Sequence, residues 1–155
     1  MSISVRQLEA GDKSAWQPLW SGYQDFYRVS LSPEVTEATW RRILDPSEPV
    51  LGLGAIVDSR LTGFAHCLFH RSTWMVADTC YLQDLYVEPQ SRGKGVARRL
   101  IEAVYAHADA ACAGQVYWLT HHTNTAARLL YDRVATNAGF IVYERHVESG
   151  GSSGS

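Results

Sequence analysis

The sequence predicts a single α/β domain, of the α+β kind, in which a mixed central sheet of six to seven strands is flanked by about four helices. Two observations predict this fold. Apolar residues recur at two-residue spacing in some segments and at three- and four-residue spacing in others. The segments follow one another as strand, two helices and hairpin, then strand, helix, strand, helix, strand, an order that combines antiparallel and parallel pairing. Residues 1–147 are expected to form the domain, and residues 148–155, rich in Gly and Ser, a flexible tail.

The N-terminal part of the chain predicts one strand and two helices. Residues 3–8 alternate apolar and polar side chains, as a short strand does. Residues 13–28 carry an aromatic stripe at helical spacing, which is interpreted as core, with the lining of a substrate site as the alternative. Ser32 and Pro33 then supply an N-cap and a first-turn proline, so a second helix is expected to follow as far as residue 44.

The middle of the chain predicts a hairpin, a further strand and a long helix. The apolar stretches 50–57 and 61–69 are separated by only three residues, which favours an antiparallel hairpin. Residues 79–87 are the most strand-like segment of the sequence. Beyond Pro89, a glycine-containing loop leads into a helix that is expected to begin near Val96 and to end near Gly114. Strand, glycine loop and helix therefore follow directly on one another.

The C-terminal part predicts two short strands on either side of a helix. Residues 116–119 form the first of these strands, and residues 140–143 form a last strand that closes the sheet. Between them, apolar residues at helical spacing predict a helix that ends before Gly139. That stripe consists of Ala126, Leu129, Leu130 and Val134.

Composition and charge exclude several classes of function. The chain has 155 residues, of which 46% are hydrophobic and 19% charged, an ordinary balance for a compact domain. Its 14 basic and 16 acidic residues leave a net charge of −2, so there is no broad positive field and no nucleic-acid partner is expected. No apolar run approaches the length of about 20 residues that a membrane helix needs, and no signal peptide is recognisable. No membrane partner and a cytoplasmic location are therefore expected.

The cysteines and histidines do not predict a metal site or hydrolase chemistry. Cys67, Cys80 and Cys112 lack CxxC spacing and are interpreted as reduced structural residues. The six histidines show no HxxxH pattern backed by a carboxylate, so no metal is predicted. A GxSxG nucleophile elbow is also absent.

The loop from Gln90 to Ala97 is the segment that carries chemistry. Glycines there let main-chain amides turn inward, and the first amides of the following helix, together with its dipole, form a site for phosphate oxygens. Arg92 and Lys94 add positive charge at the rim of this site. The Walker pattern is absent, and the GxGxxG dinucleotide pattern fails because position 98 is Arg. A pyrophosphate fits such a loop, and a plain tight turn before a helix is the alternative.

Around this loop the sequence resembles the GCN5-related N-acetyltransferase (GNAT) family. The family signature Q/R-x-x-G-x-G/A is matched by Gln90, or in an alternative register by Arg92, with Gly93 and Gly95. The preceding TyrLeuGlnAspLeuTyrVal and the later AsnThrAlaAlaArgLeuLeuTyr are similar to the strand and the last-helix motif of that family, close to its diamine acetyltransferase and Hpa2-like branches. The likeness extends over about residues 3–147.

The resemblance implies an enzyme that uses acetyl-CoA as its co-substrate. In that family the cofactor lies across the splayed end of the sheet, so that strand main-chain groups pair with the pantetheine arm and loop amides hold the pyrophosphate. An asparagine at the start of the last helix adds a hydrogen bond on the pantetheine side. The cofactor-binding residues implied in this way are Leu85, Tyr86, Val87, Arg92, Gly93, Lys94, Gly95, Val96, Ala97, Arg98 and Asn124.

Tyr131 matches the tyrosine that in this family protonates the leaving thiolate of coenzyme A. It follows Asn124 by seven residues, so both side chains are expected on one face of the last helix. A phenol is a weaker acid than a thiol, which favours stabilisation of the thiolate by a hydrogen bond over full proton transfer. A half-buried tyrosine that anchors the helix is the alternative.

Asp84 is the candidate that accepts the proton of the attacking amine, because it is a carboxylate within an apolar strand. Its alternative is a structural partner for an Arg or a His. In the polyamine-acetylating branch of the family a glutamate precedes this aspartate, whereas this chain has Gln83, a candidate to hold water or substrate. The difference leaves the proton route and a polyamine substrate open, and His121 or His122 are alternative bases.

The expected acceptor is the primary amine of a small molecule such as a polyamine or an amino acid. A lysine or N-terminal amine of a protein, or a non-catalytic sensor of acyl-CoA, are the alternatives. Tyr23 and Tyr27, from the aromatic stripe, are candidate substrate contacts, and a homodimer is expected. Three acids in the N-terminal helices hint at a cationic amine, namely Asp25, Glu34 and Glu37.

Overall fold

The computed structural model describes residues 1–147, so the tail predicted at residues 148–155 lies outside the described part of the chain. The chain divides into two compact units, one of residues 1–121 and the other beginning at His122. Each unit is described by itself. The first holds the sheet and three helices, and the second holds the last helix.

The sheet of the first unit is mixed, as predicted, and its five strands are in the order β1-β2-β3-β4-β5. The pairs β1 with β2, β2 with β3 and β3 with β4 are antiparallel, whereas β4 and β5 are parallel. The hairpin predicted from the short connection between β2 and β3 is therefore confirmed. The strands are Ile3–Gln7 (β1), Val50–Val57 (β2), Arg60–His70 (β3), Thr79–Val87 (β4) and Gln115–Tyr117 (β5).

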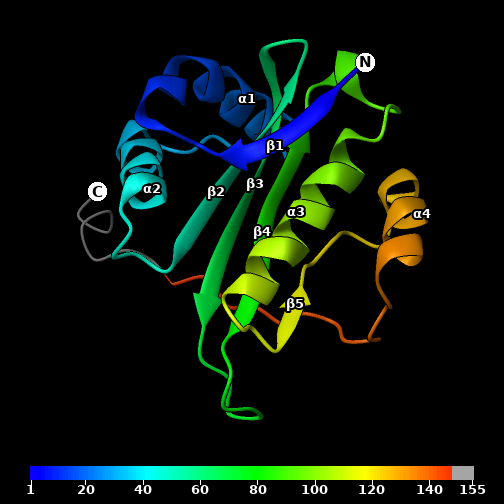
Figure 1. The fold of residues 1–155 in the computed structure, drawn as a ribbon. Helices are drawn as coiled ribbons and strands as arrows, with labels where there is room; N and C mark the ends of the chain where they lie inside the picture. Colours follow the sequence, from blue (N-terminus) through cyan, green and yellow to red (C-terminus); the bar gives the residue numbers. More distant parts are fainter. Residues whose placement is uncertain (148–155) are drawn as a thin grey trace. The chain divides into compact units, whose positions relative to one another are not determined.

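About four helices were predicted, and residues 1–147 contain four, with bounds close to those expected. They are Lys13–Phe26 (α1), Pro33–Leu44 (α2), Val96–Ala110 (α3) and Thr125–Val134 (α4). Ser32 caps α2 by accepting a hydrogen bond from the amide of Val35, as its position before Pro33 predicts. Two short 3₁₀ segments, Ala10–Asp12 (η1) and Pro89–Ser91 (η2), precede α1 and follow β4. In the first unit α3 lies across one face of the sheet, with α1 and α2 against the other (Figure 1).

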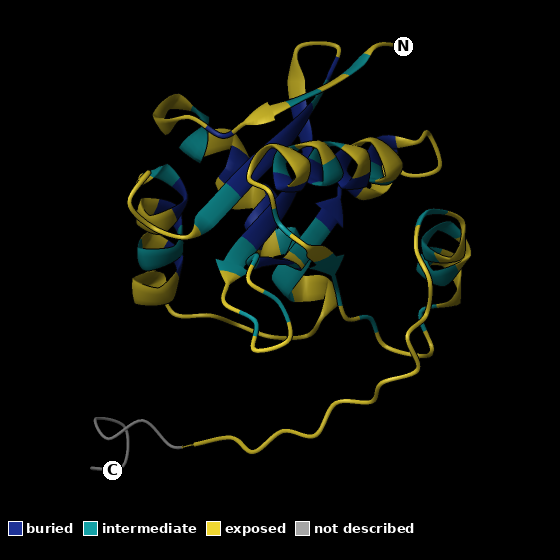
Figure 2. Cartoon of the chain, turned by 60° about the horizontal axis from the view of Figure 1, so that its bottom comes forward, coloured by how far each residue is buried: buried dark blue, intermediate teal, exposed yellow. Residues whose placement is uncertain are grey.

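The aromatic stripe of α1 packs into the core along most of its length, which confirms the interpretation from its spacing. Trp16 and Trp20 are buried and lie with their rings stacked, and Trp40 of α2 packs on Trp16. Towards the end of the helix the stripe emerges, because Tyr23 is only half-buried and Tyr27 is exposed. The buried residues therefore gather between the helices and the sheet, and the outer faces of the helices are exposed (Figure 2). The emerging end of α1 is where ligands can approach.

The sixth strand predicted at residues 140–143 is wrong, and the sheet has five strands where six to seven were expected. Within the described residues, no strand is assigned between Gly139 and Val147. The four side chains are 60% to 89% exposed. A run of aromatic and β-branched residues indicates that a segment suits a strand, whereas a strand exists only where a neighbour supplies main-chain partners.

Candidate cofactor and acceptor site

The loop between β4 and α3 presents unused main-chain amides. Gly93 and Gly95 have φ values of 76° and 87°, in the left-handed region that glycine adopts without strain. Gly95 occupies the N-cap position of α3, and no side chain caps the helix there. The first main-chain bond of the helix runs from the amide of Arg99 to the carbonyl of Gly95 at 3.1 Å. The preceding amides of Val96, Ala97 and Arg98 therefore have no acceptor within the helix, which is the arrangement that binds phosphate oxygens.

The side chain of Arg92 holds this loop against the ends of β4 and α1. Its guanidinium Nε donates to the carbonyl of Val87 at 2.8 Å, and its cation lies over the rings of Phe26 and Tyr86, 5.7 and 5.5 Å from their centroids. Its own amide donates to Pro89 at 3.3 Å within η2. The side chain thus connects the loop, the end of β4 and the end of α1. Such a stacked and hydrogen-bonded guanidinium positions the backbone, in addition to its charge.

Glu88 fixes the start of the same loop. It is buried, and its carboxylate accepts hydrogen bonds from Ser91 Oγ at 2.8 Å and from Arg60 Nη1 at 3.0 Å. The hydrogen bond from Arg60 lowers the pKa of Glu88 below its usual value, against the opposing effect of burial. The carboxylate therefore stays ionised and ties the loop to β3. Lys94, the other predicted cation, donates to the carbonyl of Gln90 at 3.2 Å.

β4 has an edge without a neighbouring strand beside this loop. β5 pairs only with Thr79, Cys80 and Tyr81, and among the described residues no strand continues that pairing along the rest of β4. The edge from Leu82 to Val87 is therefore open on the side of β5. An open strand edge can pair with an extended ligand, and Leu85, Tyr86 and Val87 lie on it.

A β-bulge in β4 sets the direction of Asp84. His66 pairs with Asp84 and Cys67 pairs with Leu82, so Gln83 is an extra residue without a partner on β3. On a regular strand, residues two positions apart point to the same side of the sheet. Here Leu82 pairs with Cys67 and Asp84 pairs with the adjacent His66, and paired residues point to the same side, so the bulge turns Leu82 and Asp84 to opposite sides. Leu82 is buried in the core, Asp84 points towards α1, and Gln83 is exposed.

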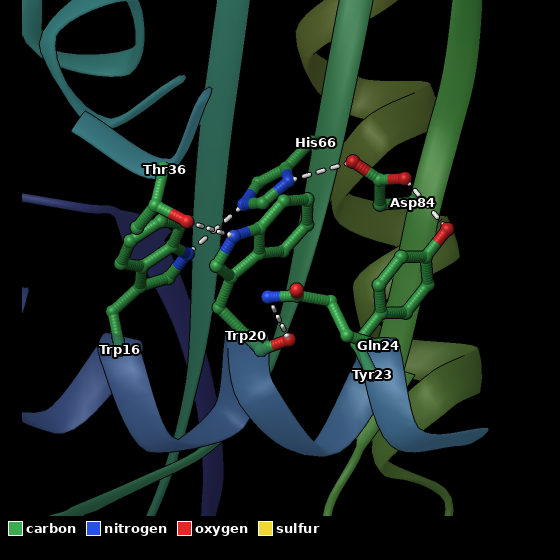
Figure 3. Close-up of polar contacts among 7 residues, drawn as sticks. All are labelled: Trp16, Trp20, Tyr23, Gln24, Thr36, His66 and Asp84. Carbon is green, nitrogen blue, oxygen red and sulfur yellow. Dashed lines mark hydrogen bonds and ion pairs between the residues drawn. The ribbon is translucent and has the colours of Figure 1, made fainter. Parts of the chain in front are cut away.

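Asp84 is held by two hydrogen-bond donors (Figure 3). The hydroxyl of Tyr23 lies 2.6 Å from Oδ1, and Nδ1 of His66 lies 2.9 Å from Oδ2. On the other side of the imidazole, the indole Nε1 of Trp16 donates to Nε2 of His66 at 3.1 Å. Since an indole only donates, Nε2 must be an acceptor, and the proton of the neutral ring is on Nδ1. Both Tyr23 and His66 therefore donate a hydrogen bond to the carboxylate.

The surroundings of Asp84 are aromatic and largely buried. The side chain of Asp84 is 12% exposed, and that of His66 is 5% exposed. Burial raises the pKa of Tyr23 far above its ordinary value, and the negative charge of Asp84 raises it further. The pKa values of Tyr27 and Tyr81 are also raised, in Tyr27 first by burial and then by Asp84. These tyrosines remain neutral phenols, which donate and accept hydrogen bonds.

The sequence predicted part of this site and missed part of it. Asp84 and Tyr23 were singled out and lie in direct contact, whereas the ring centroid of Tyr27 lies 5.0 Å from that of Tyr23, and within the described residues Tyr27 forms no hydrogen bond to Asp84. His66 and Trp16 were not predicted to belong to the site. A histidine within the apolar stretch of β3 was an available signal, because a buried imidazole needs partners for both nitrogens.

The acids considered for a cationic acceptor are less suited to that role. Glu37 forms an ion pair with Lys13, with Nζ 2.7 Å from its carboxylate. Glu34 lies in the first turn of α2, where a carboxylate favours the helix dipole. A surface hollow between α1 and α2 is lined in part by Asp25 and Glu37. Asp84 is the acid that aromatic side chains enclose.

The second unit carries the remaining predicted residues. Asn124 is the N-cap residue of α4, and Tyr131 lies within that helix, seven residues later. The guanidinium of Arg128 donates to the carbonyl of His122 at 2.8 Å, which fixes the turn before the helix. His121 is the last residue of the first unit, and His122 is the first of the second.

Across residues 1–147, no group of three or more His, Cys, Asp or Glu side chains is arranged to hold a metal ion. In the same part of the chain, no helix has the length and apolar character that crossing a membrane requires.

Comparison with known proteins gives a consistent set of relatives. The Acetyltransferase (GNAT) family matches residues 16–135. The D-amino-acid N-acetyltransferase HPA3 of Saccharomyces cerevisiae is 40% identical over 146 residues, which cover 93% of this chain and 91% of that protein. The uncharacterized N-acetyltransferase YhfO of Bacillus subtilis is 30% identical over 143 residues, 91% of this chain and 95% of that protein. Among solved structures, AAC(6')-Iy in complex with a bisubstrate analogue, CoA-S-monomethyl-acetylneamine, superposes with a TM-score of 0.82 at 18% identity, over 95% of this chain and 99% of that one.

Proposed function

The chain belongs to the acetyltransferase (GNAT) family and is an acetyl-CoA-dependent N-acetyltransferase, and from this premise we propose that its acceptor is the primary amine of a small molecule. Within that class, the α-amino group of an amino acid is the first candidate, since the relative HPA3 is a D-amino-acid N-acetyltransferase. The single observation that carries the proposal is the carboxylate of Asp84, enclosed by tyrosines on the face of β4 towards α1. Such a site suits one small cationic group.

Binding of acetyl-CoA is proposed to use the open main-chain groups beside β4. The amides of Gly93 to Arg98 would hold the pyrophosphate, and Arg92 and Lys94 would place positive charge near it. The edge at Leu85, Tyr86 and Val87 would pair with the pantetheine arm as a further strand would. Asn124 would add a hydrogen bond to the pantetheine.

The reaction is proposed to proceed by direct attack within a ternary complex. An alkylamine is protonated at pH 7, and making it neutral costs about 4 to 5 kcal/mol. Asp84 would accept that proton, and Gln83, exposed at the bulge, would contact the substrate or a water. Tyr131 would stabilise the departing thiolate by a hydrogen bond. Because the thioester is already activated, holding the amine against its carbonyl carbon supplies much of the acceleration.

The test is a panel of acceptors incubated with acetyl-CoA, with release of thiol and the mass of the acetylated product as the readouts. D- and L-amino acids, a polyamine, an aminoglycoside and a lysine-containing peptide cover the alternatives. Acetylation of a free amino acid supports the proposal, whereas acetylation of the peptide alone would replace it with a protein acceptor. Saturable binding of acetyl-CoA without any acceptor-dependent thiol release would favour a sensor.

A further inference from the structure

We infer that Tyr23 carries the proton of the attacking amine to Asp84, and that His66, fixed by Trp16, is a positioning residue for that carboxylate. The inference rests on the proposed function, because it concerns how the acceptor amine is made neutral. Four side chains from α1, β3 and β4 form one continuous hydrogen-bonded chain, from the indole of Trp16 to the hydroxyl of Tyr23 (Figure 3).

The buried end of this series of hydrogen bonds, at Trp16, cannot transmit a proton. Trp16 is fully buried and donates to Nε2 of His66, so the imidazole must donate from Nδ1 to Asp84. A proton on Nε2 would set two donors against each other in a buried site. Nδ1 of His66 therefore donates to Oδ2 of Asp84 and holds it in one place. The imidazole ring packs against the rings of Trp20 and Phe64, which restrict its rotation.

The other end of the chain faces the half-buried end of α1. Oδ1 of Asp84 has the hydroxyl of Tyr23 at 2.6 Å, and the exposed ring of Tyr27 packs on the ring of Tyr23, with their centroids 5.0 Å apart. A phenol oxygen that donates to Oδ1 still has lone pairs with which to accept a hydrogen bond from an amine. The path from the acceptor to Asp84 therefore passes through Tyr23.

The transfer moves two protons. An N–H bond of the ammonium breaks while a bond forms from that proton to the phenol oxygen, and the original proton of Tyr23 moves to Oδ1 of Asp84. The products are a neutral amine, an unchanged phenol and a carboxylic acid, which later returns its proton to water. Because burial and Asp84 raise the pKa of Tyr23 strongly, a free phenolate is not formed, and the two protons must move together.

The groups that face Asp84 determine how this transfer depends on pH. They are Tyr23 from α1, Tyr27 at the C-cap of that helix, His66 and Cys67 from β3, and Tyr81 from β4. In the described residues no Arg or Lys forms an ion pair with Asp84. No Arg or Lys side chain therefore competes with an ammonium group for this carboxylate.

The first experiment compares Tyr23→Phe with the wild-type protein across pH, using the acceptor that the panel identifies. At pH 7 the substitution is expected to lower kcat/KM by about 100-fold. The loss should shrink as the pH approaches about 10, because a growing fraction of the amine is then neutral in solution. Tyr143→Phe, at an exposed residue of the second unit, is the matched control and should leave the profile unchanged. A loss for Tyr23→Phe that is the same at every pH would overturn the transfer.

The second experiment tests the positioning role of His66. An asparagine places its amide where Nδ1 of the imidazole lies, so His66→Asn should keep part of the activity that His66→Leu loses. Nitrogen NMR of the wild-type protein should show His66 with a proton on Nδ1 and none on Nε2 from pH 6 to 8, a readout that needs no acceptor. Protonation of Nε2 would overturn the arrangement. A wild-type protein that acetylates no amine would instead overturn the proposed function.

Discussion

The hydroxyl of Tyr23 lies 2.6 Å from Oδ1 of Asp84, although the two residues are 61 positions apart in the sequence. The contact joins the end of α1 to the bulge of β4, and His66 completes it from β3. Both neighbours of the carboxylate donate, so the carboxylate accepts a hydrogen bond on each of its oxygens, whereas a neutral amide has only one acceptor oxygen.

Asp84→Asn should therefore destabilise the protein as well as lower its activity. The amide oxygen could accept from His66, but the amide N–H would then face Tyr23, so the hydroxyl of Tyr23 would have to reverse and accept, and the charge-assisted hydrogen bonds to the carboxylate would be lost. We expect a loss of about 2 kcal/mol in the free energy of unfolding, measured by urea denaturation at pH 7. Asp109→Asn, at an exposed position of α3, is the control, and equal stability of the two variants would show that the network contributes nothing.

Glycine is required at positions 93 and 95 because the backbone there has a positive φ, and not because a larger side chain would clash. No atom lies within 4 Å of a side chain added at Gly95, but its φ of 87° disfavours any residue with a Cβ. Gly95→Ala is expected to cost about 1 to 2 kcal/mol and to weaken acetyl-CoA binding, as measured by calorimetry. Gly11→Ala, which has the same open space without a positive φ, should change neither. If both substitutions behaved alike, the loop would not depend on its left-handed turn.

Glu88, which fixes the start of the phosphate loop, should make the stability of the protein depend on pH in the acid range. The pKa of Glu88 is lowered in the folded protein, first by its hydrogen bond from Arg60, so its ionised form stabilises the fold above the pKa of the unfolded chain. That contribution is lost as the pH falls through the lower, folded pKa. Unfolding free energy measured from pH 6 down to pH 3 should fall less steeply in Glu88→Gln than in the wild type. Parallel curves would exclude Glu88 as a contributor.

Tyr131→Phe should separate chemistry from binding. If the hydroxyl stabilises the departing thiolate, its removal lowers kcat by about 100-fold and changes the affinity for acetyl-CoA by less than about threefold. Steady-state turnover and calorimetry on the same preparation give the two quantities. Unchanged turnover would remove Tyr131 from the mechanism.

The elements of this fold were predictable wherever the signal is local. The stripe from Trp16 to Tyr23 gave α1, the cap at Ser32 gave α2, and the glycines before Val96 gave the start of α3. Each of these depends on residues within one or two turns of chain.

The parts that sequence reasoning missed depend on pairing between distant segments. The bulge at Gln83 exists only in the register of β4 against β3, and it alone turns Asp84 towards α1. Arg92 was predicted as a cation at the rim, but its stacking over Phe26 and Tyr86 requires that three separate segments meet. The aromatic and β-branched residues at 140–143 favour a strand, but they could not indicate whether a neighbouring strand was present.

The account rests on the amides from Gly93 to Arg98 as the site for the pyrophosphate of acetyl-CoA. Amide proton and nitrogen NMR of the labelled protein, titrated with acetyl-CoA, tests this most directly. We predict saturable shifts that are largest at these six residues and that are reproduced by coenzyme A without its acetyl group. Saturable binding that leaves these amides unmoved, or no saturable binding at all, would contradict the account.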